Sequence, residues 1–223
     1  MNADPFEDLR QQMIAVIAAQ AVFASGEIGK AAINTRVLEV MGKIPRHNFV
    51  PAEIRPYAYA DSPLPIGCSK TISQPCICAL MTDLLDVQPG DTVLEIGTGL
   101  GYQAAVLSAL AKKVYSVEII EELAEQAKRR LADQRCANVE LKLANGFHGW
   151  PEHAPYDKVI VTAGTDLVPA PLLNQLRPGG RMVIPTGLPD SQQLVLVEKD
   201  AAGRTRTKEI LRVRFSLLEG TEA

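Results

Sequence analysis

The pattern of apolar and polar positions changes near residue 92 of the chain. From there on, short apolar runs typical of buried strands alternate with longer stretches typical of helices. The predicted strands cover residues 92–96, 114–118, 139–143, 156–162 and 181–185. The predicted helices cover residues 102–111, 121–133 and 171–176. This alternation predicts an α/β fold with a doubly wound, mostly parallel sheet.

Two further apolar runs, at residues 193–198 and 209–217, follow the last of these strands. Short turns join them, and no helix is predicted between them. Strands connected in this way pair in antiparallel fashion. We therefore expect an antiparallel edge at the C-terminal end of the sheet.

The first third of the chain is organised differently. Residues 5–24 and 31–42 read as two helices, which predict an N-terminal helical extension. Residues 45–70 are rich in proline and predict an ordered loop. An apolar helix is predicted over residues 76–85, with Pro75 in its first turn and Ser73 as a candidate cap.

The apolar run from Met13 to Ala24 raises the question of a secretory signal peptide. Acidic residues precede the run, whereas signal peptides begin with a positive charge. The run is also too short to span a bilayer. We interpret it as a buried helix that ends at Gly26.

The length of 223 residues suits one domain with a buried sheet. Within this single domain, residues 1–70 would supply helices and a substrate-side loop. Residues 71–223 would form the α/β core that binds the cofactor. A monomer is the favoured oligomeric state.

The net charge of −3 and the 5 % of aromatic residues argue against a nucleic-acid partner. No stretch predicts a membrane span. Four cysteines are too few and too unevenly spaced for a disulfide scaffold or a zinc site, so we expect reduced thiols, no metal and a cytoplasmic location.

The sharpest local signal is the glycine-rich stretch that follows the first predicted strand, with Gly97, Gly99 and Gly101 in it. Glycines let the backbone approach a ligand closely. Glu118 ends the next strand, where a carboxylate can accept hydrogen bonds from both hydroxyls of a ribose. The pattern therefore predicts a nucleoside-containing ligand.

Two details favour S-adenosylmethionine over a dinucleotide. The glycines follow G-x-G-x-G spacing, which differs from the dinucleotide fingerprint. Glu95 precedes them, and a carboxylate there suits an ammonium or sulfonium group better than a pyrophosphate. The plain alternative is that Gly97-Thr98-Gly99 is only a tight turn between strand and helix.

Four blocks of sequence together resemble the protein-L-isoaspartate (D-aspartate) O-methyltransferase family. They are VMGKIPRHNFVP at residues 40–51, AYADSPLPIG at 58–67, TISQP at 71–75 and GWPEHAPYD at 149–157. The resemblance extends from about residue 30 to about residue 215 and implies a Rossmann-like class I methyltransferase fold. It also implies methyl transfer from S-adenosylmethionine to the α-carboxylate of L-isoaspartyl residues in damaged proteins or peptides, a repair reaction.

The resemblance also implies roles for individual residues. Thr71 and Ile72 would lie over the donor methyl group, and Ser73 matches the residue usually considered catalytic. Asn145 and Gly146 match positions that line the cofactor site. The residues expected at the cofactor are thus Thr71, Ile72, Glu95, Gly97, Thr98, Gly99, Gly101, Glu118, Asn145 and Gly146.

Some positions depart from the family pattern. Asn145 stands where the family often has aspartate, and Cys68 and Lys70 differ in the loop before Thr71. These changes leave open a sibling methyltransferase that acts on another carboxylate or a small molecule. A non-catalytic module that binds S-adenosylmethionine is a further alternative, and an NAD oxidoreductase is the weakest.

Overall fold

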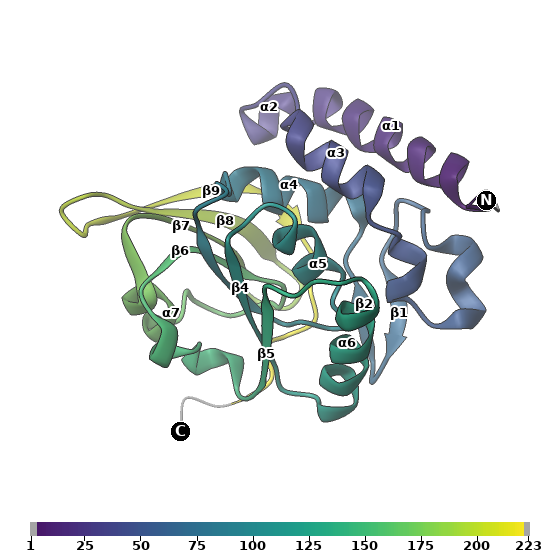
Figure 1. Ribbon diagram of the computed structural model, residues 1–223. Coiled ribbons are helices and arrows are strands. Elements are labelled where there is room, and N and C mark those ends of the chain that lie inside the picture. Colours follow the sequence, from purple (N-terminus) through teal and green to yellow (C-terminus); the bar gives the residue numbers. More distant parts are fainter. Residues whose placement is uncertain (1–3, 221–223) are drawn as a thin grey trace.

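The computed structural model describes residues 4–220 (Figure 1). A seven-stranded sheet has the order β5-β4-β3-β6-β7-β8-β9. Its strands are β3 (Thr92–Ile96), β4 (Lys113–Glu118), β5 (Val139–Leu143), β6 (Tyr156–Val161), β7 (Leu176–Thr186), β8 (Gln192–Lys199) and β9 (Thr205–Val213). The pairings from β5 to β7 are parallel, whereas β8 pairs with β7 and β9 in antiparallel fashion. The predicted parallel sheet with an antiparallel C-terminal edge is confirmed.

Helices cover both faces of this sheet (Figure 1). They are α4 (Pro75–Leu85), α5 (Tyr102–Ser108), α6 (Glu121–Asp133) and α7 (Ala170–Gln175). Because successive strand residues point to opposite faces, Val93 packs into the core beneath α4, α5 and α6, whereas Leu94 packs into the core beneath α7. The alternation of the strands therefore decides which side chain reaches which core.

The strand order reverses direction beside β3. The chain runs outward from β3 to β4 and β5, and then returns to β6 on the other side of β3. In open α/β sheets, ligands bind beyond the carboxyl ends of the strands at such a switch point. The fold therefore directs attention to the segments that follow Ile96, Glu118 and Val161.

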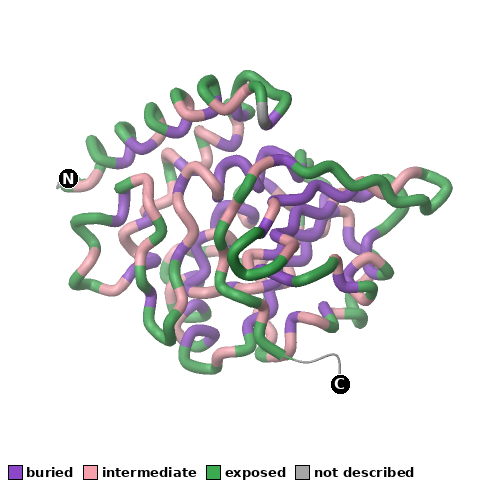
Figure 2. Tube along the Cα trace, turned by 180° about the vertical axis from the view of Figure 1, so that it is seen from behind, coloured by how far each residue is buried: buried purple, intermediate pink, exposed green. Residues whose placement is uncertain are grey.

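A layer of N-terminal helices packs on α4. It consists of α1 (Glu7–Phe23) and α3 (Thr35–Lys43), which contact α4, and of the short α2 (Ser25–Ile28), which contacts α1 and β9. The inward side of α1 is buried through Met13 and Ile17, and its outer side faces solvent (Figure 2). Across residues 4–220, no helix combines the length and the apolar character that crossing a membrane requires.

The ends of these helices differ slightly from expectation. The chain makes one further helical turn after α1 and stops at Gly29, whose φ of 72° is left-handed, so the stop is not at Gly26. The helix predicted over 31–42 begins later, at Thr35, because the Asn34 side chain accepts a hydrogen bond from the Arg36 amide and caps it.

The proline-rich stretch contains regular structure that the sequence does not predict. It holds the 3₁₀ helices η1 (Arg46–Phe49) and η2 (Ala52–Tyr57) and a hairpin of β1 (Leu64–Gly67) and β2 (Lys70–Ile72). Cys68 and Ser69 form the turn, with φ of 51° and 56°. Two-residue turns of this kind normally use Asn or Gly, so the usual hairpin signal is missing.

Three further boundaries complete the fold. Gln74, and not Ser73, occupies the cap position of α4 and makes no side-chain capping bond, so the predicted cap role of Ser73 is wrong. β7 begins at Leu176, five residues earlier than expected, because Leu176 pairs with Tyr156 before an irregularity in the register. The short helices η3 (Gly146–His148) and η4 (Pro151–His153) connect β5 to β6.

Candidate active site

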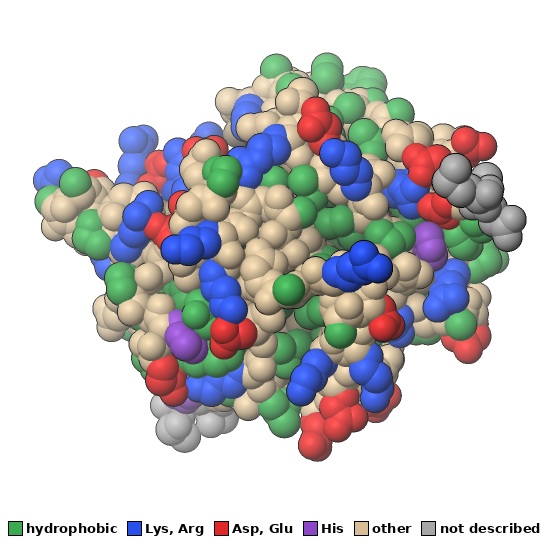
Figure 3. All heavy atoms as spheres, viewed as in Figure 1, with side chains coloured by type: hydrophobic (Ala, Val, Ile, Leu, Met, Phe, Trp, Pro, Cys, Tyr) green, Lys and Arg blue, Asp and Glu red, His purple; other side chains and the backbone are tan. Residues whose placement is uncertain are grey.

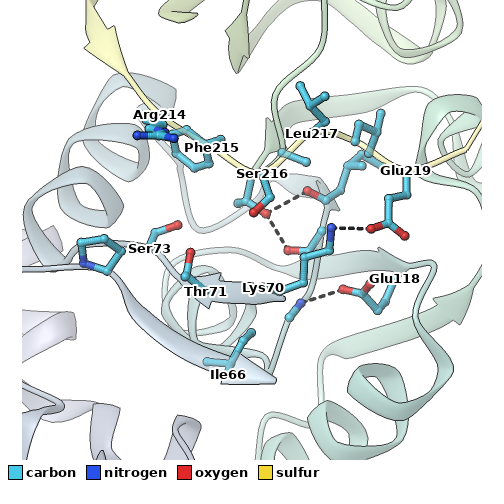
Figure 4. A pocket seen from close by; sticks show the side chains of 18 of the residues that line it. Ile66, Lys70, Thr71, Ser73, Glu118, Arg214, Phe215, Ser216, Leu217 and Glu219 are labelled. Carbon is cyan, nitrogen blue, oxygen red and sulfur yellow. Dashed lines mark hydrogen bonds and ion pairs between the residues drawn. The ribbon is translucent and has the colours of Figure 1, made fainter. Parts of the chain in front are cut away.

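A cavity of about 460 Å³ lies at the switch point of the sheet. This volume falls within the roughly 300–1,000 Å³ of typical small-molecule sites. The ends of β3, β4 and β6 form its floor, the β1–β2 hairpin covers one side, and the segment after β9 covers another (Figure 4). Three parts of the chain that are distant in sequence therefore enclose one space.

Two glycines of the loop after β3 line the cavity. Gly97 has a φ of 91°, and a Cβ placed there would lie 2.5 Å from Thr162 Oγ1. Gly99 has a φ of 56°, and its Cβ would lie 3.2 Å from Ile66 Cδ1 of the hairpin. Backbone conformation and close packing thus both exclude side chains, which leaves the floor open to a ligand.

Gly101 has a structural role at the start of α5. It caps α5 with a φ of 95°, and a Cβ there would contact Leu131 of α6. It is not among the residues that line the cavity. Gly101 therefore serves the packing of helices beneath the loop, and its contact with the cofactor stays a prediction.

Glu118 lies where the sequence predicts it, at the end of β4 on the cavity wall. One carboxylate oxygen accepts a hydrogen bond from the Gly99 amide at 2.8 Å. The other accepts from the amides of Ile119 and Ile120 at 3.0 and 3.1 Å. These bonds fix the carboxylate at the loop and leave acceptor capacity on its oxygens.

Glu95 and Thr98 are close to the cavity but do not line it. Glu95 is fully buried, and its Oε2 accepts a hydrogen bond from Ser116 Oγ at 2.5 Å. Ser116 is in turn 2.6 Å from the Thr98 hydroxyl. Strand alternation explains this placement, because Ile96 faces the cavity and its neighbour Glu95 faces the other side.

Burial raises the pKa of Glu95 to about 8, although the hydrogen bond from Ser116 opposes this rise. Its Oε1 atom has no hydrogen-bond partner within the described chain. The contact between this carboxylate and an ammonium group stays a prediction. Glu95, Ser116 and Thr98 form a buried network that supports the glycine loop from below.

The hairpin brings Thr71 and Ser73 to the cavity, whereas Ile72 between them packs into the core. Figure 4 shows both hydroxyl side chains on the same side of the opening. Alternation along β2 again separates these neighbours. Thr71 and Ser73 thus lie at the cavity, where their roles stay predictions, and Ile72 supports the hairpin from the other side.

Gly146 lines the cavity, and Asn145 does not. The Asn145 side chain accepts a hydrogen bond from the Phe147 amide at 2.9 Å and caps η3. It also lies against Gly220, where an added Cβ would come within 2.4 Å of it. A Cβ on Gly146 would lie 2.4 Å from Ile96, so glycine is required for this close approach.

The segment from Arg212 to Glu219 contributes a whole wall that the sequence does not reveal as part of the site. It is held by backbone bonds, including 2.8 Å from the Gly164 amide to the Ser216 carbonyl. Lys70 of the hairpin forms a 2.5 Å ion pair with Glu219 across the opening (Figure 4). The sequence signal is limited to the apolar residues that follow β9.

The cysteines carry no evident chemistry. Burial raises the pKa of Cys76 to about 11 and that of Cys78 to about 12, so both remain thiols near neutral pH. In the part of the chain that the structure describes, no three His, Cys, Asp or Glu side chains are grouped as a metal site would require.

Comparison with known proteins gives the family. A family model described as protein-L-isoaspartate(D-aspartate) O-methyltransferase matches residues 19–223. The chain belongs to this family. A protein-L-isoaspartate O-methyltransferase 1 from a Polaromonas species is 62 % identical over 222 residues, which span 100 % of this chain and 94 % of the relative. A protein-L-isoaspartate O-methyltransferase 2 from Syntrophobacter fumaroxidans is 54 % identical over 97 % of this chain and 88 % of its own length.

Solved structures agree with this assignment. A protein-L-isoaspartate O-methyltransferase superposes with a TM-score of 0.81 at 29 % identity, over 95 % of this chain and 66 % of that longer chain. A putative member from Plasmodium falciparum, in complex with S-adenosyl-L-homocysteine, has a TM-score of 0.78 at 20 % identity, over 94 % and 98 %. The Rossmann-like methyltransferase fold and the S-adenosylmethionine-dependent enzyme class predicted from the motifs are confirmed.

Proposed function

We propose that the chain methylates the α-carboxylate of L-isoaspartyl residues in damaged proteins or peptides, with S-adenosylmethionine as donor. The observation that carries this proposal is the meeting of two features at one cavity. The Glu118 carboxylate and the glycine floor lie on one side, and the Thr71 and Ser73 hydroxyls lie on the other. A nucleoside and a carboxylate would therefore meet between them.

The lining fits the cofactor. Glu118 would accept hydrogen bonds from the ribose hydroxyls, and Gly97 and Gly99 would allow close approach of the backbone. The apolar side chains of Val117 and Ile119 would flank the adenine ring. S-adenosylmethionine, when bound, supplies an electrophilic methyl group on a sulfonium.

The chain's own contribution to the reaction is alignment. A free α-carboxylate has a pKa of roughly 3.5, so it is ionised near neutral pH and needs no general base. The Ser73 hydroxyl would donate a hydrogen bond to one carboxylate oxygen and leave the other free to attack. Holding the reactants in line and excluding water contributes about 7–11 kcal/mol when the geometry is good.

The proposal places the enzyme in the cytoplasm as a monomer that acts on protein and peptide substrates. Its four cysteines are free thiols in the structure, as in reducing compartments. Basic and acidic side chains are interspersed over the face shown in Figure 3, which suits varied polypeptides better than a nucleic acid.

The test is transfer of labelled methyl from S-adenosylmethionine to an L-isoaspartyl peptide, beside its normal L-aspartyl twin. Base-labile label on the isoaspartyl peptide alone is expected. Cofactor binding without label on either peptide would refute the proposed substrate and favour a sibling methyltransferase. Binding without transfer to any of a panel of carboxylates would indicate a non-catalytic module.

A Ser73→Ala variant tests the assigned role. We expect kcat to fall by roughly 10-fold or more, the scale of one lost hydrogen bond to a charged group, with little change in cofactor affinity. Ser191→Ala, at an exposed position in the β7–β8 connection, is the matched control. Loss of cofactor binding in the Ser73 variant would instead show that this residue is structural.

A further inference from the structure

The side chain of Arg46 is buried beneath the segment that carries Thr71 and Ser73. Arg46 is 0 % exposed, the rarest state for an arginine. Its Nε donates to the Ala58 carbonyl at 2.8 Å, and its Nη2 donates to the Ser73 carbonyl at 2.7 Å. The guanidinium also lies 4.8 Å from the ring centroid of Tyr102, the residue that begins α5 after the glycine loop.

Burial of the Arg46 charge lowers the stability of the fold, so stability alone does not explain it. Within residues 4–220, Arg46 has no carboxylate at ion-pair distance, and a buried charge without one carries a penalty of several kcal/mol. Apolar residues of similar volume often stabilise such sites better. The buried guanidinium is therefore best explained by the geometry it enforces. It joins Ala58, before the β1–β2 hairpin, to Ser73, after it, and holds both against Tyr102 of α5.

A carboxylate holds the same segment from its other end. Asp61 Oδ1 accepts a hydrogen bond from the Cys76 amide at 2.9 Å. Asp61 Oδ2 accepts from the side chains of Gln74 at 2.7 Å and Gln20 at 2.6 Å. Because Gln20 belongs to α1, this carboxylate also joins the N-terminal helical layer to the first turn of α4.

The two charged residues fix the backbone on both sides of Ser73 and leave its side chain uncommitted. The Ser73 hydroxyl forms no hydrogen bond with another residue of the described chain and lines the cavity. We propose that Arg46 and Asp61 are positioning residues for methyl transfer, which hold the Ser73 hydroxyl at the angle that the acceptor carboxylate requires. This inference rests on the proposed function, and neither residue would touch the reactants.

The expected size of the effect follows from the sensitivity of in-line attack to alignment. A misplacement of about 1 Å can cost about 100-fold in rate. Lysine at position 46 keeps the charge but loses the planar fork that spans two carbonyls. Asparagine at position 61 keeps the shape and replaces one acceptor oxygen by a donor, which faces other donors.

The experiment compares Arg46→Lys and Asp61→Asn with Arg36→Lys. Arg36 is a matched control, because its guanidinium also donates to two backbone carbonyls, those of Val87 and Leu110, far from the hairpin. Three quantities are measured: kcat on the isoaspartyl peptide per cofactor-binding site, the Kd for S-adenosylmethionine by calorimetry, and hydrogen exchange of residues 71–77 in the S-adenosyl-L-homocysteine complex.

We expect kcat per site to fall about 10–100-fold in Arg46→Lys and about 3–10-fold in Asp61→Asn, with Kd within about 3-fold and exchange at 71–77 increased. Arg36→Lys should keep kcat within about 2-fold. A variant at position 46 or 61 that keeps kcat per site, or that loses kcat and cofactor affinity in parallel, overturns the inference. If the wild-type enzyme transfers label to neither peptide, the proposed function is refuted. Hydrogen exchange at residues 71–77 that is unchanged in the Arg46 and Asp61 variants would separately refute their role in holding this segment.

Discussion

Replacement of Glu95 by glutamine should change how the stability of the protein depends on pH. The carboxylate is 0 % exposed and has Ser116 as its hydrogen-bond donor, with one oxygen unpartnered. Burial raises its pKa from the usual 4.5 to about 8. The native state therefore holds this proton far more tightly than the unfolded chain does.

The sign follows from this difference. Because the folded-state pKa lies above the unfolded one, the contribution of Glu95 to stability is fully present below pH 4.5 and is lost as the pH rises through 8. An interval of about 3.5 pH units, at about 1.4 kcal/mol each, gives a loss of ~5 kcal/mol. Glutamine stays neutral and escapes this loss, although its buried amide adds a cost of about 1–3 kcal/mol that does not vary with pH.

Urea unfolding of the cofactor-free protein at several values between pH 5.5 and 8 would measure the effect. The free energy of unfolding of Glu95→Gln, relative to wild type, should rise by about 3 kcal/mol across this range. Glu53→Gln, at an exposed position, controls for the removal of one negative charge. A difference that stays constant within ~1 kcal/mol would refute the reasoning, because it would mean that the carboxylate ionises normally where it lies.

Two further substitutions test the floor and wall of the cavity. Glu118→Gln should weaken S-adenosylmethionine binding by about 10–100-fold in calorimetry, since hydrogen bonds to charged groups contribute about 1.5–3 kcal/mol each. Glu121→Gln, in the exposed first turn of α6, is the control and should leave the affinity unchanged. Equal affinities in the two variants would show that Glu118 does not contact the cofactor. Gly97→Ala should lower the free energy of unfolding by at least ~2 kcal/mol, because alanine there combines a φ of 91° with a 2.5 Å contact to Thr162 Oγ1. Gly90→Ala, which meets nothing within 4 Å, should change it by less than ~0.5 kcal/mol, and an equal loss in both variants would contradict the steric argument.

The sheet and the glycine loop could be predicted because their signals are local. Apolar runs of strand length, glycines after β3 and an acid after β4 are all readable within windows of a few residues. The burial of Glu95 also follows from a local pattern. Ile96 and Glu95 are neighbours in a strand and face opposite sides, so Ile96 lines the cavity while Glu95 is buried beside Ser116.

The hairpin and the C-terminal wall could not be predicted in the same way. Cys68 and Ser69 adopt left-handed φ values that cost roughly 1–2 kcal/mol each for such residues, so their identities give no turn signal. Beyond Val213, where β9 ends, the wall is irregular, and its place depends on contacts with segments far away in the chain, such as Gly164. Tertiary packing decides these features, and local propensity does not.

The ion pair between Lys70 and Glu219 joins residues that are 149 positions apart. Every strand of the sheet precedes Glu219 in the chain, so the last wall of the cavity leaves the ribosome after all the others. Contacts of such long sequence separation form late in folding, because the entropy of closing the loop must be overcome first. A nascent or partly folded chain can therefore hold a complete sheet while the cavity beside it is still open to solvent.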